Sequence, residues 1–263
     1  MEIIPPFKLN VPGLFVTATD TGVGKTIATC CICNALHEKF PDCKVRAFKP
    51  FASECLPAEG GRFNLDAVAM RKFTDPQVPM DLVNPVRFDP PLAPGVAAEE
   101  AGERVDWQRV VSAAHELDEQ ADFMVVEGAG GLFVPLDPDH PHVTILDLAA
   151  HIGYPVLIVA RTTLGTLNHT TMTVRLLQER GLHVVGVVMN NFQPQLGSTA
   201  DDPSIRTNRR WLEKMTGVPV LTVLPEVAAD AVVPHEGVMD EQLFSACAGV
   251  PWAELMHASK PLV

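Results

Sequence analysis

The segment from Leu14 to Thr26 restricts the possible folds more than any other feature of the chain. It reads Leu-Phe-Val-Thr-Ala-Thr-Asp-Thr-Gly-Val-Gly-Lys-Thr, so an apolar run that predicts a buried strand leads into a glycine-containing turn. Gly-Lys-Thr then opens a segment with helical character. This order of strand, turn and helix is the setting of a P-loop, where backbone N–H groups bind phosphate oxygens at a helix N-terminus. The segment therefore predicts an α/β fold with a phosphate site at the start of its first helix.

Thr19 to Thr26 form the predicted phosphate site. We expect Lys25 to contact the β- and γ-phosphates and the hydroxyl of Thr26 to reach Mg²⁺. The usual pattern begins with Gly six positions before the Lys, and this chain has Thr19 there, so the strict motif is broken. Its Gly-Lys-Thr core is intact, and the turn before it is expected to supply backbone N–H groups from Gly22, Val23 and Gly24.

Short β-branched runs alternate with longer helical patterns along the chain. The predicted strands are Leu14–Thr17, Val45–Lys49, Phe123–Glu127, Val156–Ala160, Val184–Met189 and Val220–Leu224. The predicted helices are Lys25–Phe40, Asp66–Lys72, Glu99–Gln120, Thr144–Ile152, Thr166–Arg180 and Ser204–Met215. Unbroken apolar strands separated by helices indicate a doubly wound, mostly parallel sheet with helices on both faces, as in P-loop NTPases. A length of 263 residues suits a single α/β domain spanning residues 1–263.

Three segments depart from the strand–helix rhythm. Residues 78–95 are rich in proline but mixed with Leu, Val and Phe, which indicates an ordered excursion rather than a linker. Residues 193–203 form a polar loop, and the pattern weakens after Pro225. A last helix is expected over Met239–Met256.

Composition and charge exclude several classes of partner and location. The formal net charge is −12, from 20 basic and 32 acidic residues, whereas nucleic-acid binding requires a basic surface. No apolar run of about 18 residues predicts a membrane span, and the first ten residues lack the features of a signal peptide. Three of the six cysteines fall on one predicted helix, where adjacent side chains diverge and make a poor disulfide set. We therefore expect a cytoplasmic protein that binds neither nucleic acid nor membrane, with reduced thiols at Cys30, Cys31, Cys33, Cys43, Cys55 and Cys247.

Polar residues stand at or after the ends of the predicted strands, where a parallel sheet gathers its ligands. Lys49 ends the second strand before Pro50, and it is either a second ammonium for phosphoryl chemistry or a solvated lysine. Glu127 ends the third strand before Gly-Ala-Gly-Gly, and a buried acid requires a partner or a metal ion. Asp66 is a metal ligand, a helix cap or a carboxylate of the first helical turn, and Asn190 contacts a base or closes a turn. His140 and His142, without a supporting acid or Cys, make a weak metal site.

Taken together, these residues resemble dethiobiotin synthetases, the ATP-dependent enzymes of biotin biosynthesis. The resemblance covers most of the chain, and its ordered set of motifs is far more specific than the P-loop alone. The matching pieces are Thr-Ala-Thr-Asp-Thr-Gly-Val-Gly-Lys-Thr (17–26), Lys-Pro-Phe-Ala-Ser (49–53), Asp-Ala (66–67), Asn-Pro-Val-Arg-Phe (84–88), Val-Glu-Gly-Ala-Gly-Gly (126–131) and Leu-Gly-Thr-Leu-Asn-His (164–169).

The resemblance implies a reaction and its cofactors. Carbon dioxide adds to an amine of 7,8-diaminononanoate, and the resulting carbamate attacks the γ-phosphate of ATP to give a mixed anhydride. The second amine then closes the ring to dethiobiotin and expels phosphate. ATP and Mg²⁺ are the implied cofactors, and the implied assembly is a homodimer with substrate at the interface.

The resemblance also assigns roles by position. Thr26, Asp66 and Glu127 would hold Mg²⁺, and Lys25 and Lys49 would flank the γ-phosphate and the carbamate. The remaining roles concern the substrate and the base: carbamate binding by Thr21 and Ser53, contact with adenine by Asn190, and contact with the neighbouring subunit's substrate by Gly165 and Asn168.

Three departures from the family pattern limit this transfer. Ala18 stands where many members have Gly, and alanine suits that place only with a negative φ. Gly22 stands where an acidic residue is common, so any carboxylate role there is absent. Residues 192–205 match the substrate-carboxylate loop poorly, and no residue is transferred from it.

Two other functions compete with the synthetase. A ParA-type switch would carry an extra Lys early in the P-loop and a basic DNA-binding face, neither of which this chain shows. A relative of the cobyrinic-acid amidases would need a further glutaminase domain, for which the chain is too short. A non-catalytic nucleotide-binding module is the remaining alternative.

Overall fold

A central sheet of six parallel strands organises the chain, and the computed structural model describes it over residues 3–7, 9–59, 61–192 and 202–258. The strand order is β10-β9-β8-β1-β7-β2, and every neighbouring pair in it is parallel. The chain leaves β1 for the β7–β2 side of the sheet and then returns to the β8–β10 side. Its strands are β1 (Gly13–Ala18), β2 (Val45–Phe48), β7 (Phe123–Glu127), β8 (Val156–Arg161), β9 (Val184–Asn190) and β10 (Val220–Leu224).

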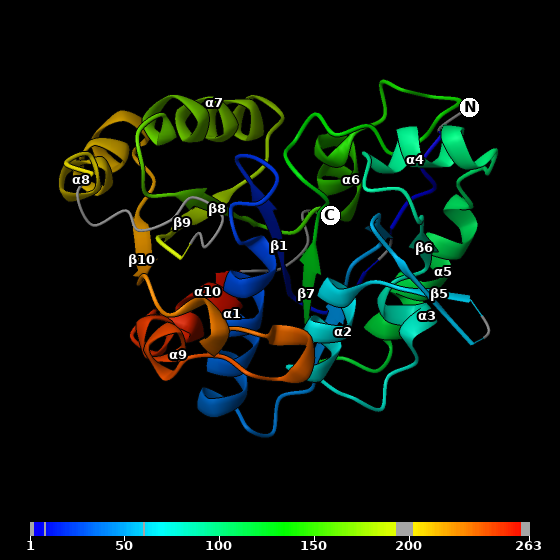
Figure 1. Cartoon of the computed structure of the whole chain (residues 1–263), viewed down its shortest axis with the longest axis horizontal. Helices are drawn as coiled ribbons and strands as arrows, with labels where there is room; N and C mark the ends of the chain where they lie inside the picture. Colours follow the sequence, from blue (N-terminus) through cyan, green and yellow to red (C-terminus); the bar gives the residue numbers. More distant parts are fainter. Residues whose placement is uncertain (1–2, 8, 60, 193–201, 259–263) are drawn as a thin grey trace.

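Helices cover both faces of this sheet (Figure 1). The alternation of side chains along β1 shows why both faces need cover. Leu14 and Val16 belong to a buried cluster with α1, α9 and α10, whereas Phe15 belongs to a second cluster with α5, α6 and α7. The principal helices are α1 (Lys25–Lys39), α2 (Leu65–Lys72), α4 (Pro94–Ala101), α5 (Trp107–Asp118), α6 (Ile145–Ile152), α7 (Thr166–Glu179), α8 (Ile205–Thr216), α9 (Glu241–Ala248) and α10 (Trp252–Ala258).

The doubly wound fold predicted from the sequence is therefore confirmed. All six predicted strands are present with ends that differ by at most one residue, and five of the predicted helices agree equally well. Unbroken β-branched runs identified the strands because both faces of a parallel sheet are buried. No helix of the described part of the chain is long and apolar enough to cross a membrane.

Two helix predictions are wrong for the same physical reason. The helix expected over 99–120 is two helices, because Gly102 adopts φ of +65° and Asp106 starts α5 by accepting a hydrogen bond from the backbone N–H of Arg109 at 3.0 Å. The helix expected over 239–256 is likewise divided into α9 and α10, because Gly249 and Pro251 lie between them. In both cases the helical spacing of apolar residues continues across the break, whereas the residues at the break end one helix and start the next.

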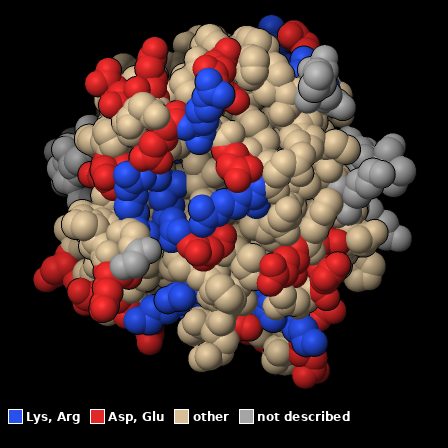
Figure 2. All heavy atoms as spheres, turned by 90° about the vertical axis from the view of Figure 1, so that its right-hand side faces the viewer, with Lys and Arg blue, Asp and Glu red and all other residues tan. Residues whose placement is uncertain are grey.

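The proline-rich excursion over 78–95 is ordered, as predicted. It holds a short helix, α3 (Met80–Val83), and a strand, β6 (Val86–Arg87), that pairs with β3 (Phe51–Ala52). The hairpin of β4 (Leu56–Ala58) and β5 (Gly61–Phe63) lies on the same side of the molecule. Figure 2 views this side and shows basic side chains gathered on it among acidic ones. Most of the predicted polar loop, residues 193–201, lies outside the described residues.

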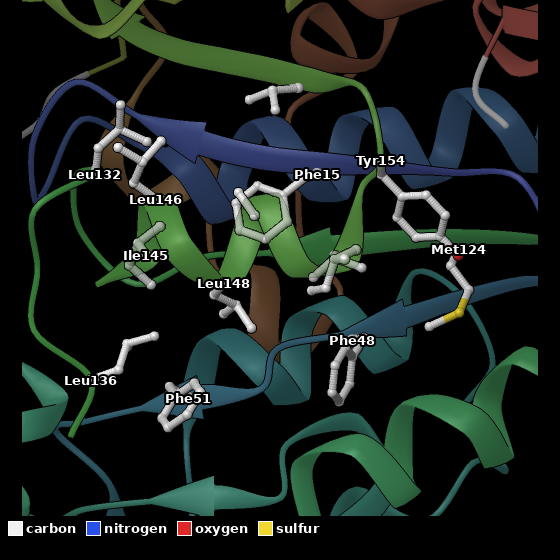
Figure 3. Packing of buried hydrophobic residues seen from close by; sticks show 14 of the residues in the cluster. Phe15, Phe48, Phe51, Met124, Leu132, Leu136, Ile145, Leu146, Leu148 and Tyr154 are labelled. Carbon is white, nitrogen blue, oxygen red and sulfur yellow. The ribbon is translucent and has the colours of Figure 1, made fainter. Parts of the chain in front are cut away.

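Aromatic and aliphatic side chains fix the elements beneath the carboxyl edge of the sheet. Figure 3 shows Phe15 pointing from β1 toward Ile145 and Leu148 of α6. Phe51 packs edge-on against Trp107 with ring centroids 5.2 Å apart, which anchors the chain after β2. Two 3₁₀ helices, η2 (Ala229–Ala231) and η3 (Pro234–Glu236), connect β10 to α9.

Candidate active site

The predicted site residues converge at the carboxyl edge of β1, β2 and β7. The three strands are parallel neighbours, so their ends meet at one edge of the sheet. The P-loop follows β1, Lys49 follows β2 and Glu127 is the last residue of β7. Asp66 reaches the same edge from the first turn of α2.

The turn of the P-loop depends on two glycines in the left-handed region. Gly22 has φ of +74° and Gly24 has φ of +83°. A β-carbon on Gly24 would also lie 2.0 Å from Nδ2 of Asn190, so this position excludes a side chain on two grounds. Among the described residues only Glu54 is a non-glycine with positive φ, so Ala18 satisfies the condition set for alanine at its position.

Glu127 is the centre of the site. Its side chain is fully buried, and each carboxylate oxygen accepts hydrogen bonds from neighbouring elements. Oε1 accepts from Nζ of Lys49 at 2.5 Å and from the hydroxyl of Thr26 at 2.9 Å. Oε2 accepts from the hydroxyl of Thr29 at 2.6 Å. Charge-assisted hydrogen bonds of this kind offset the cost of burying the carboxylate.

Lys49 joins the two carboxylates of the site. Its ammonium lies 2.5 Å from Oε1 of Glu127 and 3.2 Å from Oδ2 of Asp66. Burial pushes the pKa of Lys49 down, but the charges and hydrogen bonds of Glu127 and Asp66 outweigh burial and raise it above its ordinary value. Lys49 is therefore a fixed cation rather than a solvated surface lysine.

Lys25 has a different environment from Lys49. Its Nζ donates to the backbone carbonyl of Gly130 at 3.3 Å. Burial and the nearby charge of Lys49 lower its pKa below the ordinary value, although Glu127 opposes the shift. A buried ammonium held by one neutral carbonyl is suited to receive an anionic ligand.

Asp66 lies at the open side of the site, with its side chain half exposed. Burial pushes its pKa up, but the ammonium of Lys49 outweighs burial and lowers the pKa below its ordinary value. The helix-cap interpretation of Asp66 is wrong, because Asn64 caps α2 by accepting from the backbone N–H of Ala67 at 3.1 Å. The other structural alternative, an acid of the first helical turn, is confirmed, and this acid forms an ion pair with Lys49.

Thr29 is the contact of Glu127 that the sequence analysis missed. It follows Thr26 by three positions on α1, so the two hydroxyls lie on one face of the helix and reach the same carboxylate. Its hydroxyl also lies 3.0 Å from the carbonyl of Lys25. The three-residue spacing of Thr26 and Thr29 on a helix that follows the P-loop could have indicated that both hydroxyls reach one acid.

Thr21 and Ser53 border the same region. Thr21 is exposed in the P-loop, and its hydroxyl would lie 3.1 Å from a β-carbon on Gly130. Ser53 is half-buried, and its carbonyl accepts from Nδ2 of Asn64 at 2.9 Å. A cavity of about 390 Å³ opens beside Thr21 and is lined by Thr19, Asp20, Thr21, Gly131, Leu132, Phe133, Val134, His169, Met172, Thr173 and Leu176.

Asn190 links the end of β9 to the P-loop. Its Nδ2 donates to the carbonyls of Val23 at 3.0 Å and Phe192 at 2.9 Å, and its Oδ1 accepts from the backbone N–H of Phe192 at 3.0 Å. The side chain thus fixes the turn before Lys25. Gly165 and Asn168 lie apart from the carboxylate–lysine group, exposed at the start of α7 after β8.

The two histidines of the loop before α6 contact each other. The rings of His140 and His142 pack edge to face with centroids 6.0 Å apart. Across the described ranges no group of three or more His, Cys, Asp or Glu side chains is placed to hold a metal ion by itself.

The chain is similar to known proteins in both sequence and fold. A family model described as an AAA domain matches residues 12–230. The chain is 43% identical over 213 residues to the ATP-dependent dethiobiotin synthetase BioD of Anaeromyxobacter dehalogenans strain 2CP-1, covering 81% of this chain and 89% of that protein. It is 35% identical over 217 residues to the enzyme of the same name from Thermodesulfovibrio yellowstonii, covering 81% and 88%. A ParA family ATPase from Chlorobium tepidum shares the fold, with a TM-score of 0.53 over 91% of this chain and 96% of that structure at 17% identity.

Proposed function

This chain belongs to the dethiobiotin synthetase family, and on that premise we propose that it closes the ring of dethiobiotin from 7,8-diaminononanoate, CO₂ and ATP. The observation that carries the proposal is the group formed by Lys25, Lys49, Asp66 and Glu127 at one edge of the sheet. Two lysines and two acids balance one another in this group. An anionic ligand at this edge would therefore approach two ammonium groups that neighbouring residues already hold in position.

The reaction proceeds in three steps. An amine nitrogen of the substrate attacks the carbon of CO₂ and loses a proton, which gives a carbamate. A carbamate oxygen attacks the γ-phosphorus of ATP and ADP leaves, which gives a carbamic–phosphoric anhydride. The second amine then attacks the carbonyl carbon and expels inorganic phosphate. The ring is thereby closed without a covalent bond to the protein.

Electrostatics explains why the site needs two lysines. Two unit charges about 4 Å apart repel by roughly 4 kcal/mol at an effective dielectric near 20, and carbamate and triphosphate must approach at least this closely. In the proposed site Lys25 contacts the β- and γ-phosphates from the P-loop, together with backbone N–H groups of residues 22–24. In the proposed site Lys49 contacts the carbamate from the end of β2.

Magnesium fits the oxygen donors of the site. Thr26, Asp66 and Glu127 offer hydroxyl and carboxylate oxygens, the ligands that Mg²⁺ prefers, and Lys49 already occupies a cation position between the two acids. When bound, Mg²⁺ would supply the positive charge that a triphosphate requires beyond the two lysines. These three residues would hold it together with phosphate oxygens.

Thr21 and Ser53 are the proposed hydrogen-bond donors to the carbamate. Thr21 belongs to the P-loop, and Ser53 directly follows β3 in the segment that begins at Lys49. The cavity beside Thr21 supplies apolar walls for the carbon chain of the substrate. Asn190 is the proposed contact of adenine, and its position against Val23 sets it next to the P-loop.

A homodimer is proposed to complete the substrate site. Gly165 and Asn168 are exposed at the start of α7, where they can reach a second copy. Phe133, Leu164 and Met172 are large apolar residues that are exposed by 66%, 83% and 49%. Phe133 and Met172 line the cavity, and Leu164 precedes α7. Exposed apolar side chains gathered beside a cavity favour burial against a partner.

The chain is further proposed to act in the cytoplasm as a single domain over residues 1–263. All six cysteines are free thiols, in keeping with a reducing compartment. The net charge of −12 disfavours binding to nucleic acids and to anionic membrane surfaces.

A direct assay tests the proposed reaction. Purified protein is incubated with ATP, Mg²⁺, bicarbonate and 7,8-diaminononanoate, and dethiobiotin is detected by mass spectrometry. Lys49→Ala is expected to abolish turnover while nucleotide still binds, whereas Lys44→Ala, at the exposed opposite end of β2, should leave turnover unchanged. Absence of product from the unmodified protein at saturating substrates would refute the proposal.

A subunit-mixing experiment tests the shared site. If Asn168 serves the neighbour's substrate while Lys49 serves its own subunit, a heterodimer of Lys49→Ala and Asn168→Ala subunits contains one intact site. Mixing the two weakly active variants under conditions of subunit exchange should therefore raise activity. No gain after demonstrated exchange would mean that both residues act in the same subunit.

A further inference from the structure

A second cleft lies on the side of the molecule that carries α3, α5 and the β4–β5 hairpin. Its volume is about 510 Å³, large enough for a small organic ligand. Figure 2 shows basic side chains gathered on this side of the molecule, interleaved with acidic ones. The cleft, called the arginine cleft below, is lined by Gly61, Arg62, Asp81, Pro85, Val86, Arg87, Phe88, Glu103, Arg104, Asp106 and Arg109.

One of the four arginines is a fixed wall of the arginine cleft. Arg62 forms ion pairs with Asp89 at 2.9 Å and with Glu103 at 2.9 Å, and it also donates to the carbonyl of Arg87 at 3.1 Å. Its nitrogens are used by these contacts, which tie β5 to the segments that follow β6 and α4. Arg62 therefore holds the walls of the cleft together, and the other arginines are the candidates for binding a ligand.

Arg87 and Arg109 share a single acid. Both guanidinium groups form ion pairs with the same oxygen of Asp81, Arg87 at short range and Arg109 at 3.5 Å. Each guanidinium has five N–H donors, and one carboxylate cannot satisfy two of these groups. Asp106, the other acid near Arg109, accepts from the backbone N–H of Arg109 as the cap of α5. The N–H donors of the two guanidinium groups thus outnumber the hydrogen bonds that Asp81 Oδ1 can accept, so donors remain for a ligand.

The exposure of these side chains also indicates a binding site rather than a closed ion pair. The side chain of Arg87 is only 15% exposed, so its guanidinium is held at the floor of the cleft. Asp81 is 65% exposed and Arg109 is 48% exposed, so both face solvent at the opening. Arg104, which is 88% exposed and 3.7 Å from Asp139, stands at the rim. A second anion can approach the two arginines from the open side.

We propose that the arginine cleft binds a small anion with carboxylate or phosphate groups, held between Arg87 and Arg109 beside or in place of Asp81. Paired guanidinium forks match the planar oxygens of carboxylate and phosphate. The site is separate from the P-loop, yet it adjoins the active site through the backbone, because Arg87 of β6 pairs with Ala52, the residue before Ser53.

Calorimetric titration tests the proposal with citrate and inorganic phosphate as separate probes. The protein is first saturated with Mg²⁺ and a non-hydrolysable ATP analogue, so that the P-loop is occupied and cannot account for the signal. We expect at least one of the two probes to bind one site, and the Arg87→Gln/Arg109→Gln variant to bind it about tenfold more weakly or worse, since each charge-assisted hydrogen bond is lost. Arg210→Gln, on the exposed face of α8, is the matched control and should bind normally.

A variant that is expected to strengthen binding distinguishes an effect on the binding site from a folding defect. Asp81→Asn removes the carboxylate that competes for both arginines, so it should tighten binding of the probe, while circular dichroism verifies that every variant is folded. The proposal is overturned if neither probe binds the nucleotide-loaded protein, if the double variant binds as well as the unmodified protein, or if Asp81→Asn weakens binding. Because every titration is made without substrate, its outcome does not depend on the proposed synthetase activity.

Discussion

Replacement of Lys49 by methionine isolates the most consequential ion pair of the site. Lys49 and Glu127 are both buried, and their charged atoms lie 2.5 Å apart. At an effective dielectric near 20, unit charges at this separation attract by roughly 7 kcal/mol before desolvation is counted. Methionine retains much of the apolar stem but leaves the carboxylate with only the hydroxyls of Thr26 and Thr29. Breaking a buried pair in this way typically costs about 3–5 kcal/mol.

Urea unfolding of the nucleotide-free protein measures this cost. Lys49→Met should lower the free energy of unfolding by about 3–5 kcal/mol, whereas Lys44→Met, an exposed residue immediately before β2, should change it by less than about 0.5 kcal/mol. Adding Glu127→Gln to Lys49→Met removes the unpaired charge and should recover about half of the loss or more.

Two outcomes would refute this reasoning. A cost below about 1 kcal/mol for Lys49→Met would mean that the buried ion pair contributes little to stability. A double variant no more stable than Lys49→Met would mean that the loss arises from packing rather than from charge.

Three further perturbations test the surroundings of this pair. Thr29→Val leaves one oxygen of Glu127 without its donor and should lower the free energy of unfolding in urea by about 1–3 kcal/mol. Thr29→Ser keeps the hydroxyl and should retain most of the stability. Equal losses in the two variants would exclude the hydrogen bond. Gly24→Ala should destabilise the protein by about 1–3 kcal/mol and abolish binding of a fluorescent ATP analogue. The substitution places an alanine at a positive φ, with its β-carbon against the side chain of Asn190. Normal binding would contradict the structure. The folded-state pKa of Asp66 lies below its unfolded value of about 3.8, so its stabilisation is present above that pH and is lost as the pH falls through the folded pKa. The stability difference between the unmodified protein and Asp66→Asn should accordingly shrink below about pH 3.8 in urea titrations, and a constant difference would exclude the Lys49 contact.

The sequence alone determined the class of fold and the place of the phosphate site. Unbroken β-branched runs such as Phe123–Glu127 specify strands buried on both faces, and this property is local enough to be visible without tertiary structure. The Gly-Lys-Thr segment specified where a helix begins. Lys49 and Glu127 could be selected as candidates because a charged residue at the end of an apolar strand requires a partner.

Tertiary structure decided which partner each candidate has. The parallel register brings Lys49 of one strand end against Glu127 of the next, and the pitch of α1 adds Thr29, which no strand-end rule could select. Helix ends also depended on local conformation, since Gly102 broke a periodicity that continues on both sides of it. The arginine cleft could not be predicted from the sequence, because Arg87 and Arg109 come from a short strand and a helix that only the fold places around Asp81. Hydrophobic burial is thus encoded in short stretches of the chain, whereas the pairing of charges depends on distances that only the assembled sheet and helices define.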